Sequence, residues 1–281
     1  MADKSKKINV SLVISIQAAT AVLISSLIIK IFGMGTLWGS LNNGDLIVGG
    51  LNFATMFCSN YSIKFVNYPF MVLAKSAKVL PVVLTGWLLS VYKLTAAQIM
   101  IAVMITIGLV IFNISKVNGI EDESLYGIAL VLLSLLFDGL VGAQTDKNHQ
   151  KQKRPFAYYS MLYTNTCLLF GNLVMFSYSH FFMQDTSLSR ILNDAALLRE
   201  TILISLCGAF GQIFIYLTMS LYDNYKVAII TTTRKCLSVV ASAFLFNHKF
   251  SQEQWIGASM VMIATCAEVY LGNKNKKVKP N

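Results

Sequence analysis

The chain has 281 residues, of which 55% are hydrophobic and only 13% are charged, and its formal net charge is +10. Soluble domains carry about 25% charged residues, so this composition excludes an ordinary water-soluble globular protein and places the apolar excess against lipid.

Apolar blocks of roughly 20 residues, the length that a bilayer-spanning helix requires, follow one another from the N-terminus. The first block comes after Lys4, Lys6 and Lys7 and is too long for the apolar core of a cleaved signal peptide, so we interpret it as a retained span. The expected spans are 8–32, 46–66, 69–91, 96–115, 126–145, 158–178, 201–221, 227–246 and 255–271. The sequence therefore predicts an all-α fold, a polytopic transmembrane helix bundle of about nine spans.

Basic loop residues predict which side of the membrane each loop faces, because lysine and arginine favour the cytosolic side. The loop 146–154 and the tail after Leu271 are rich in lysine, whereas the loop 116–124 carries Glu121, Asp122 and Glu123. The first two are therefore expected in the cytosol, together with the C-terminus. An odd number of spans, however, would place the N-terminal lysines on the opposite side, against the rule.

Two lysines close to the C-terminus allow two interpretations. Lys277 and Lys279 match the K-x-K-x-x signal by which coat proteins retrieve membrane proteins to the endoplasmic reticulum. A basic tail that binds anionic lipid headgroups on the cytosolic side explains them equally well.

The sequence contains no pattern typical of a catalytic or metal-binding protein. Its five cysteines fall inside the expected spans without C-x-x-C spacing, and its three histidines lie in or beside loops, so we predict buried thiols and no metal site. No H-E-x-x-H or G-x-G-D motif is present, and Asp138 with Gly139 lacks a second matching aspartate. We therefore expect no enzyme, no cofactor and no nucleic-acid partner.

A weak internal repeat relates the region before the acidic loop to the end of the chain. A shift of 156 residues (234 − 78) matches Lys78 with Arg234, Val83 with Val239, Lys93 with Lys249, Thr95 with Ser251 and Gln98 with Gln254. The two segments are an odd number of spans apart and so run in opposite directions, as in the inverted repeats of secondary transporters. We predict an N-terminal repeat at 1–119, of about four spans, and an inverted C-terminal repeat at 120–281, of about five spans and the basic tail.

Cations interrupt the apolar pattern at matched places in the two repeats. Lys75 and Lys78 lie three residues apart on one helical face, and Arg234 and Lys235 open the run RKCLSVVASAFLF. A cation near the bilayer centre costs roughly 2.5–3.5 kcal/mol on insertion scales, so its presence calls for a function. We interpret this set as a phosphate-binding site, because arginine clamps two oxygens and lysine acts as a mobile point charge.

The alternative is that these cations extend to the lipid headgroups, as we expect for Lys30 and Lys64 at the block ends. The interior acids that would neutralise them, Asp138 and Glu268, are fewer than the cations. A net positive cavity that takes a polyanion is therefore the favoured interpretation.

Two polar pairs inside other spans are candidates for binding the rest of a ligand, its nucleoside or sugar. Gln212 and Tyr216 share a helical face, and Asn60 and Tyr61 offer the same chemistry in the second block. An amide and a phenol can bind the edge and the face of a nucleobase, but such side chains also join transmembrane helices. Both interpretations stay open.

Four stretches of the chain resemble a known family. They are FVNYPFMVLAKSAKVLPV at 65–82, FDGLVGAQTDKNHQ at 137–150, GQIFIYLT at 211–218 and IITTTRKCLSVVASAFLF at 229–246. Together they resemble the B branch of the nucleotide-sugar transporters, which includes the UDP-galactose transporter homologues of the endoplasmic reticulum and belongs to the drug/metabolite transporter superfamily. The resemblance runs from Ile8 to Gly272.

The resemblance implies an inverted-repeat drug/metabolite transporter fold of ten helices with alternating access to a central cavity. The block 8–32 resembles the family's second helix, so the design expected here is ten helices minus the first, which accounts for the odd number of spans. By similarity, Lys75, Lys78, Arg234 and Lys235 match the family's basic positions.

The resemblance also implies a function. The expected activity is antiport of a nucleotide sugar, of the UDP-galactose or UDP-glucose class, into the lumen of the endoplasmic reticulum or Golgi in exchange for a nucleotide. Exchange of ATP for ADP across the endoplasmic-reticulum membrane is one alternative. A non-transporting, truncated or regulatory membrane protein is another, because the family's first helix is expected to be missing.

Overall fold

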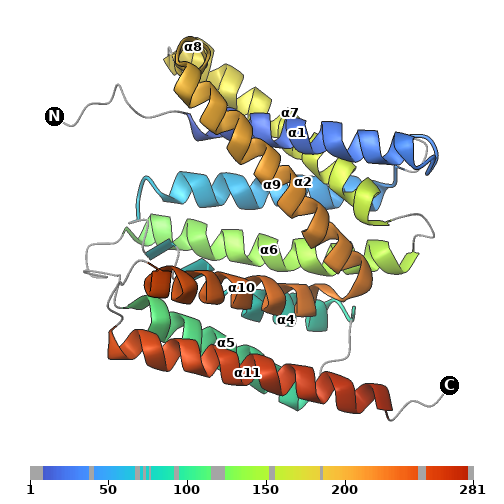
Figure 1. The fold of residues 1–281 in the computed structure, drawn as a ribbon, viewed down its shortest axis with the longest axis vertical. Coiled ribbons are helices and arrows are strands. Elements are labelled where there is room, and N and C mark those ends of the chain that lie inside the picture. Colours follow the sequence, from blue (N-terminus) through green and yellow to red (C-terminus); the bar gives the residue numbers. More distant parts are fainter. Residues whose placement is uncertain are drawn as a thin grey trace. The chain divides into compact units, whose positions relative to one another are not determined.

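The computed structural model describes residues 9–37, 41–66, 70–71, 74–75, 77–91, 95–114, 124–151, 156–183, 186–245 and 251–277. Every regular element in these ranges is helical (Figure 1). The helices are α1 (Val10–Ile31), α2 (Asn43–Ser62), α4 (Val79–Leu88), α5 (Ala96–Ile114), α6 (Leu125–Lys151), α7 (Phe156–Met183), α8 (Ser187–Asn193), α9 (Ala195–Leu221), α10 (Asn224–Leu245) and α11 (Gln252–Lys277). The all-α prediction is confirmed, and every expected span except 69–91, of which α4 covers only Val79–Leu88, coincides closely with a helix.

Some helix ends differ from the expected ones. α6 continues to Lys151 and takes up much of the expected loop 146–154, because neither glycine nor proline occurs between Gly142 and Pro155 to end it. α11 continues into the expected tail, and α8 is an additional short helix. Lys279 lies outside the described residues, as does the side chain of Lys277.

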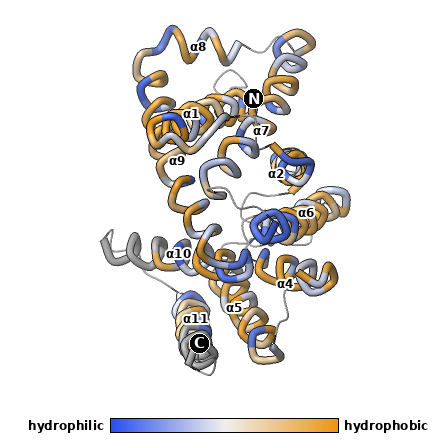
Figure 2. Tube along the Cα trace, turned by 90° about the vertical axis from the view of Figure 1, so that its right-hand side faces the viewer, coloured by the Kyte–Doolittle hydropathy of each residue, from blue (hydrophilic) through white to orange (hydrophobic). Residues whose placement is uncertain are grey.

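Three of the described helices, α1, α6 and α9, are long and apolar enough to cross a membrane. α7 and α8 add a fourth if they are taken together as one bent span, and the apolar helices α4 and Ala96–Phe112 of α5 are shorter. Figure 2 shows apolar residues along most of the helices. These features are those of a polytopic membrane protein, while the number of about nine spans stays a prediction.

The chain forms two compact units, each built from two segments. The first unit comprises Met1–Ala54 and Lys147–Tyr222, and the second comprises Thr55–Asp146 and Asp223–Asn281. The chain passes between them inside α2, inside α6, and between α9 and α10. The two units are defined by packing and not by chain order. They therefore do not test the repeats at 1–119 and 120–281, which stay a prediction.

The first unit is built around α1, which packs along α7 and α9. Tyr159 and Tyr163, one turn apart on α7, are almost fully buried beside Ile29. Their hydroxyls donate to the backbone carbonyls of Met34 at 3.0 Å and Leu37 at 2.7 Å. The two tyrosines therefore hold the segment that follows α1 against α7.

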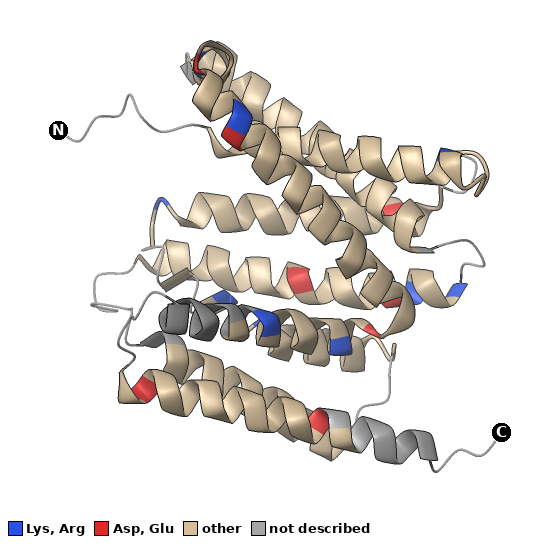
Figure 3. Ribbon diagram, viewed as in Figure 1, with Lys and Arg blue, Asp and Glu red and all other residues tan. Residues whose placement is uncertain are grey.

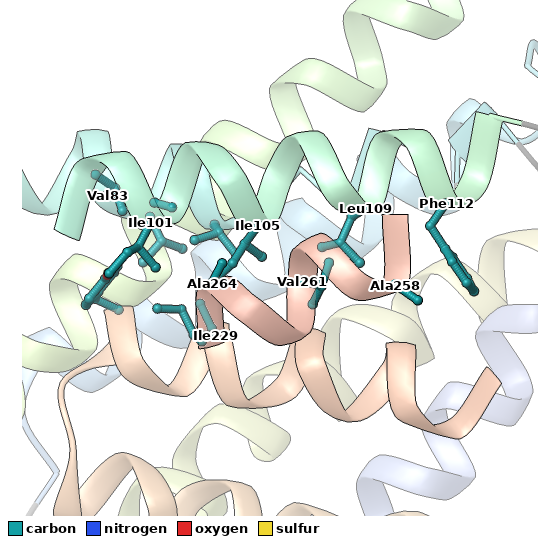
Figure 4. Close-up of a cluster of buried hydrophobic side chains, with 14 residues drawn as sticks. Val83, Ile101, Ile105, Leu109, Phe112, Ile229, Ala258, Val261 and Ala264 are labelled. Atoms are coloured by element: carbon teal, nitrogen blue, oxygen red, sulfur yellow. The ribbon is translucent and has the colours of Figure 1, made fainter. Parts of the chain in front are cut away.

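The second unit is built around α5 and α11, with α4 and α10 alongside. Residue numbers rise along α5 in the direction in which they fall along α11, so the two helices run in opposite directions (Figure 4). A Cβ atom added to Gly257 would lie 2.5 Å from the Gly108 carbonyl oxygen and 2.6 Å from the Phe112 nitrogen. The missing side chain lets two backbones approach closely, as is typical of membrane helix pairs.

α5 and α11 begin with the same hydrogen-bonded turn. The backbone N–H of Thr95 donates to Gln98 Oε1 at 3.0 Å, and the N–H of Gln98 donates to Thr95 Oγ1 at 3.4 Å. Ser251 and Gln254 make the same two bonds at 3.1 and 3.4 Å. Both turns are capping boxes, and they lie 156 residues (251 − 95) apart. The shift that relates the predicted repeats therefore matches local structure as well as sequence.

Candidate functional site

The predicted phosphate-binding side chains that the structure describes all lie in the second unit. Lys75 and Lys78 precede α4, Arg234 lies in α10, and α4 packs against α10. The two lysines are partly buried and Arg234 is exposed. The side chain of Lys235 lies outside the described residues. Charged residues are sparse on the helices (Figure 3), so cations on two neighbouring elements set this region apart.

The prediction of one uninterrupted helix at 69–91 is wrong, because the helix is interrupted between the two lysines and the start of α4. The N–H of Lys78 donates to the Lys75 carbonyl at 3.4 Å, in a tight turn of i to i+3 type, and α4 begins only at Val79. Pro81 is the physical reason. Its ring would collide with the Ala77 carbonyl in a continuous α-helix, whereas proline is tolerated in the first turn of a new helix. This proline is the sequence signal that marks the break.

The break changes what Lys78 presents to a ligand. Lys78 is the N-cap residue of α4, so it lies at the start of a helix and not in its middle. The start of a helix carries the positive end of the helix dipole. At this start the N–H of Leu80 donates to the Ala77 carbonyl at 3.1 Å and Pro81 has no N–H, so the dipole and the lysine charge are what a ligand would meet. A cation at such a start is suited to phosphate oxygens, and broken helices supply substrate contacts in many transporters.

One of the two predicted neutralising acids lies on a helix that closely approaches α4. Asp138 is partly buried in α6. A Cβ atom added to its neighbour Gly139 would lie 2.7 Å from the Pro81 carbonyl oxygen and 2.8 Å from Thr85 Oγ1. The glycine therefore lets α6 pack directly on α4, immediately after the helix break.

The other predicted acid holds the start of α10. Glu268 is 8% exposed and accepts a hydrogen bond from the Tyr225 hydroxyl at 3.2 Å. The same hydroxyl lies 3.1 Å from the backbone carbonyl oxygen of Gln98, a second acceptor for its single proton. Tyr225 thus joins α10 to both α11 and α5, and Glu268 helps to fix the helix that carries Arg234.

A third acid, Asp146, was expected in a loop and is instead buried near the end of α6. Asp146 is 4% exposed, and its two oxygens accept the backbone N–H of Asn224 at 3.0 and 3.1 Å. The Asn224 Nδ2 group also donates to it, at 3.3 Å. Asp146 therefore caps α10 from α6. Its place in the stretch FDGLVGAQTDKNHQ was visible in the sequence, but its partner, 78 residues away, was not.

Replacing Asp146 with alanine is expected to lower the free energy of unfolding by about 1–3 kcal/mol, because the buried donors of Asn224 lose their acceptor. The measurement is the thermal unfolding midpoint of the purified protein in detergent. Asp194→Ala is the matched control, since Asp194 caps α9 with an exposed side chain and its loss typically costs about 1 kcal/mol. A smaller loss for Asp146 than for Asp194 would contradict the buried cap.

The residues predicted to bind a nucleoside or sugar are divided between the two units. The pair in the first unit contacts a neighbouring helix. Gln212 Oε1 on α9 accepts a hydrogen bond from Asn165 Nδ2 on α7 at 2.9 Å. Tyr216, one turn later on α9, is hydrogen-bonded to Thr164 of α7. These contacts favour the helix-packing interpretation of Gln212 and Tyr216.

The pair on α2 belongs to the second unit, together with the cations. The ring of Tyr61 stacks on Phe57 with centroids 5.8 Å apart and meets Phe65 edge-on at 5.4 Å. Lys64 Nζ lies 4.7 Å from the centre of the same ring. Tyr61 is therefore part of a partly exposed aromatic row, and Asn60 beside it is partly buried.

Within the described ranges, no group of three or more His, Cys, Asp or Glu side chains could hold a metal ion. The cysteines that the structure describes in full, Cys58, Cys167, Cys207 and Cys266, are free thiols. The expectation of no cofactor stays a prediction.

Comparison with known proteins identifies the family. The sequence model of the UAA transporter family matches residues 46–272, a range that includes the helix break and all the candidate substrate-binding residues. The chain belongs to the UAA transporter family. The resemblance to nucleotide-sugar transporters is thereby confirmed, and with it the class of polytopic membrane proteins.

Curated relatives within the UAA family agree with this assignment. Solute carrier family 35 member B1 of Dictyostelium discoideum is 32% identical over 229 residues, which cover 79% of this chain and 57% of that protein. The protein of the same name from Bos taurus is 34% identical over 227 residues, covering 79% and 69%. UDP-galactose transporter homolog 1 of Eremothecium gossypii is 29% identical over 206 residues, covering 72% and 64%. The match thus spans little more than half to about two thirds of these relatives.

Proposed function

We propose that this chain is a secondary antiporter that moves a nucleotide sugar of the UDP-galactose or UDP-glucose class into the endoplasmic reticulum or Golgi lumen in exchange for a nucleotide. The observation that carries the proposal is the helix break at Lys75 and Lys78, in the same unit as Arg234 on the neighbouring α10. Membership of the UAA transporter family supports transport. The relative from Eremothecium gossypii is a UDP-galactose transporter homologue by name, which supports UDP-galactose.

The proposed binding chemistry is that of a pyrophosphate. Arg234 would clamp two phosphate oxygens with its planar fork, while Lys75, Lys78 and Lys235 would add mobile positive charge. The positive end of the α4 dipole would add to this charge. We assign recognition to the phosphates, because Gln212, Tyr216 and Tyr61 already contact neighbouring side chains.

A second candidate, exchange of ATP for ADP, is supported by the same observation. Lysine, arginine and the positive end of a helix dipole attract phosphate oxygens whatever the rest of the ligand is. A site built from them therefore suits a nucleotide as well as a nucleotide sugar. The experiment below includes both.

The location is also a proposal. Lys277 and Lys279 near the C-terminus would act as a retrieval signal that coat proteins recognise from the cytosol, which would keep the protein in the endoplasmic reticulum. Replacing both by serine should shift the protein to the Golgi or beyond, as seen by microscopy of the tagged protein. If the tail serves only to bind lipid headgroups, the distribution will stay unchanged.

Exchange in proteoliposomes tests the activity. Vesicles containing the purified chain are preloaded with UMP, ADP, ATP or nothing, and uptake of labelled UDP-galactose, UDP-glucose and ATP is followed. Uptake of a UDP-sugar that is stimulated by internal UMP supports the proposal. Stimulated uptake of ATP alone supports the second candidate. No stimulated uptake, beside a full-length UAA relative that is active in the same vesicles, would mean a non-transporting or regulatory protein.

A further inference from the structure

The turn of α6 that leads to Asp138 packs on the chain just before Lys75. Leu135 of α6 lies in a buried cluster with Met71, and Ala74 packs against the same cluster. Leu135 comes three residues before Asp138, and Ala74 directly precedes Lys75. All of these residues belong to the second unit. This contact therefore brings the acidic and the basic position close to each other.

The residue after Asp138 packs on the chain just after Lys78. A Cβ atom added to Gly139 would lie 2.7 Å from the Pro81 carbonyl oxygen, and Pro81 follows Lys78 by three residues. The contacts at 135 and 139 thus enclose Asp138 on α6. On the facing segment, the contacts at 74 and 81 enclose both lysines.

Asp138 lies on the buried face of α6. Val131 and Ser134, seven and four residues earlier and so on the same helical face, are 1% and 0% exposed. Leu132 and Leu136 on the opposite face are 56% and 52% exposed. The carboxyl group of Asp138 therefore faces the protein and not lipid, and a charge in that position requires a counter-ion.

Two other acids are buried in the described part of this unit, and both hold α10. Asp146 accepts the backbone N–H of Asn224 at 3.0 and 3.1 Å. Glu268 accepts the hydroxyl of Tyr225 at 3.2 Å. Their carboxylates are therefore used at the start of α10. The position of Asp138 opposite the helix break is the one that fits the lysines.

We infer that Asp138 is the counter-ion of Lys75 and Lys78 and sets the charge of the anion that the site selects. The inference rests on the proposed function. A carboxylate repels every phosphate ligand, and the repulsion grows with the number of negative charges on the ligand. A nucleotide sugar has a diphosphate esterified at both ends, so it carries fewer charges than ADP or ATP.

Asp138 therefore weakens the binding of ADP and ATP more than the binding of a nucleotide sugar. Specificity is a difference of affinities, and a repulsive group that acts mainly on the competitor increases it. The cations alone would favour the most highly charged nucleotide. The acid beside them shifts the preference toward UDP-galactose or UDP-glucose.

Removing the charge of Asp138 tests this selectivity. Dissociation constants of UDP-glucose, UMP, ADP and ATP are obtained from the shift of the thermal unfolding midpoint that each causes in the purified chain. Asp138→Asn should lower the Kd of ATP about tenfold relative to that of UDP-glucose, with ADP between them. Asp138→Glu should retain most of the wild-type ratio. Glu253→Gln, which removes an exposed acid from the same unit, is the matched control and should leave the ratio unchanged.

A second measurement needs neither ligand nor transport. In the ligand-free chain, Asp138→Asn should lower the unfolding midpoint by about 2–4 °C, because the lysines lose their counter-ion. The loss should be smaller in a Lys78→Ala background, since residues that interact give non-additive effects.

An equal change of Kd for all four ligands would overturn the inference, and so would additive effects of Asp138→Asn and Lys78→Ala on the midpoint. Loss of UDP-glucose binding alone would assign Asp138 to the sugar hydroxyls instead. A wild-type chain that none of the four anions stabilises would remove the proposed function, and the selectivity with it. The ligand-free measurement would then still decide whether Asp138 is the counter-ion of the lysines.

Discussion

Gly257→Ala is expected to destabilise the second unit by about 1–3 kcal/mol, in spite of alanine being the better helix former. The new Cβ atom would lie 2.5 Å from the Gly108 carbonyl oxygen and 2.9 Å from Phe112 Cα. These are backbone atoms of α5, so no side chain can rotate out of the way. α5 and α11 would have to move apart, and the packing of the core between them would loosen. The thermal unfolding midpoint in detergent measures the loss.

Two other glycines make this prediction a graded series. At Gly108 an added Cβ atom would meet its nearest neighbours at 3.0 Å, so Gly108→Ala should cost less than Gly257→Ala. At Gly208 in α9 an added Cβ atom would meet nothing within 4 Å, so Gly208→Ala should be neutral or stabilising by up to about 1 kcal/mol. A series in which Gly257→Ala is no worse than Gly208→Ala would disprove the close contact of the two backbones.

Lys78→Ala and Arg234→Ala are each expected to reduce substrate exchange by about tenfold to a hundredfold, because a hydrogen bond to a charged group contributes about 1.5–3 kcal/mol. Arg234→Lys should restore only part of the activity, since an ammonium cannot clamp two oxygens. Initial exchange rates in proteoliposomes and nucleotide-induced shifts of the unfolding midpoint measure the two effects.

The control for this prediction is Lys30→Ala, which removes an exposed lysine in the last turn of α1. Neither this variant nor the two site variants should lower the unfolding midpoint of the ligand-free protein, because cations in apolar spans oppose insertion. If Lys78→Ala and Arg234→Ala leave exchange and ligand binding unchanged, the assignment of phosphate binding to these residues is wrong.

The helices were predictable from the sequence because long apolar blocks have few alternatives in a membrane. The starts of α5 and α11 were predictable as matched turns from Thr95 with Gln98 and Ser251 with Gln254. The break before α4 was also predictable in principle, because Pro81 excludes a continuous helix through Ala77.

Other features depend on residues that are distant in the chain. Asp146 becomes a buried cap only because Asn224 is folded against it. Nothing in the composition of α2 or α6 marks the points at which these helices pass from one compact unit to the other.

The capping boxes of α5 and α11 have a consequence for how such a chain enters a membrane. The two helices run in opposite directions (Figure 4), so their first turns lie at opposite ends of the pair. Each turn satisfies backbone N–H groups with its own side chains and depends on no particular headgroup or aqueous compartment. The first turn of such a helix is capped in the same way whichever side of a membrane it lies on. A duplicated copy could therefore be inserted upside down without any change to the way its helix starts.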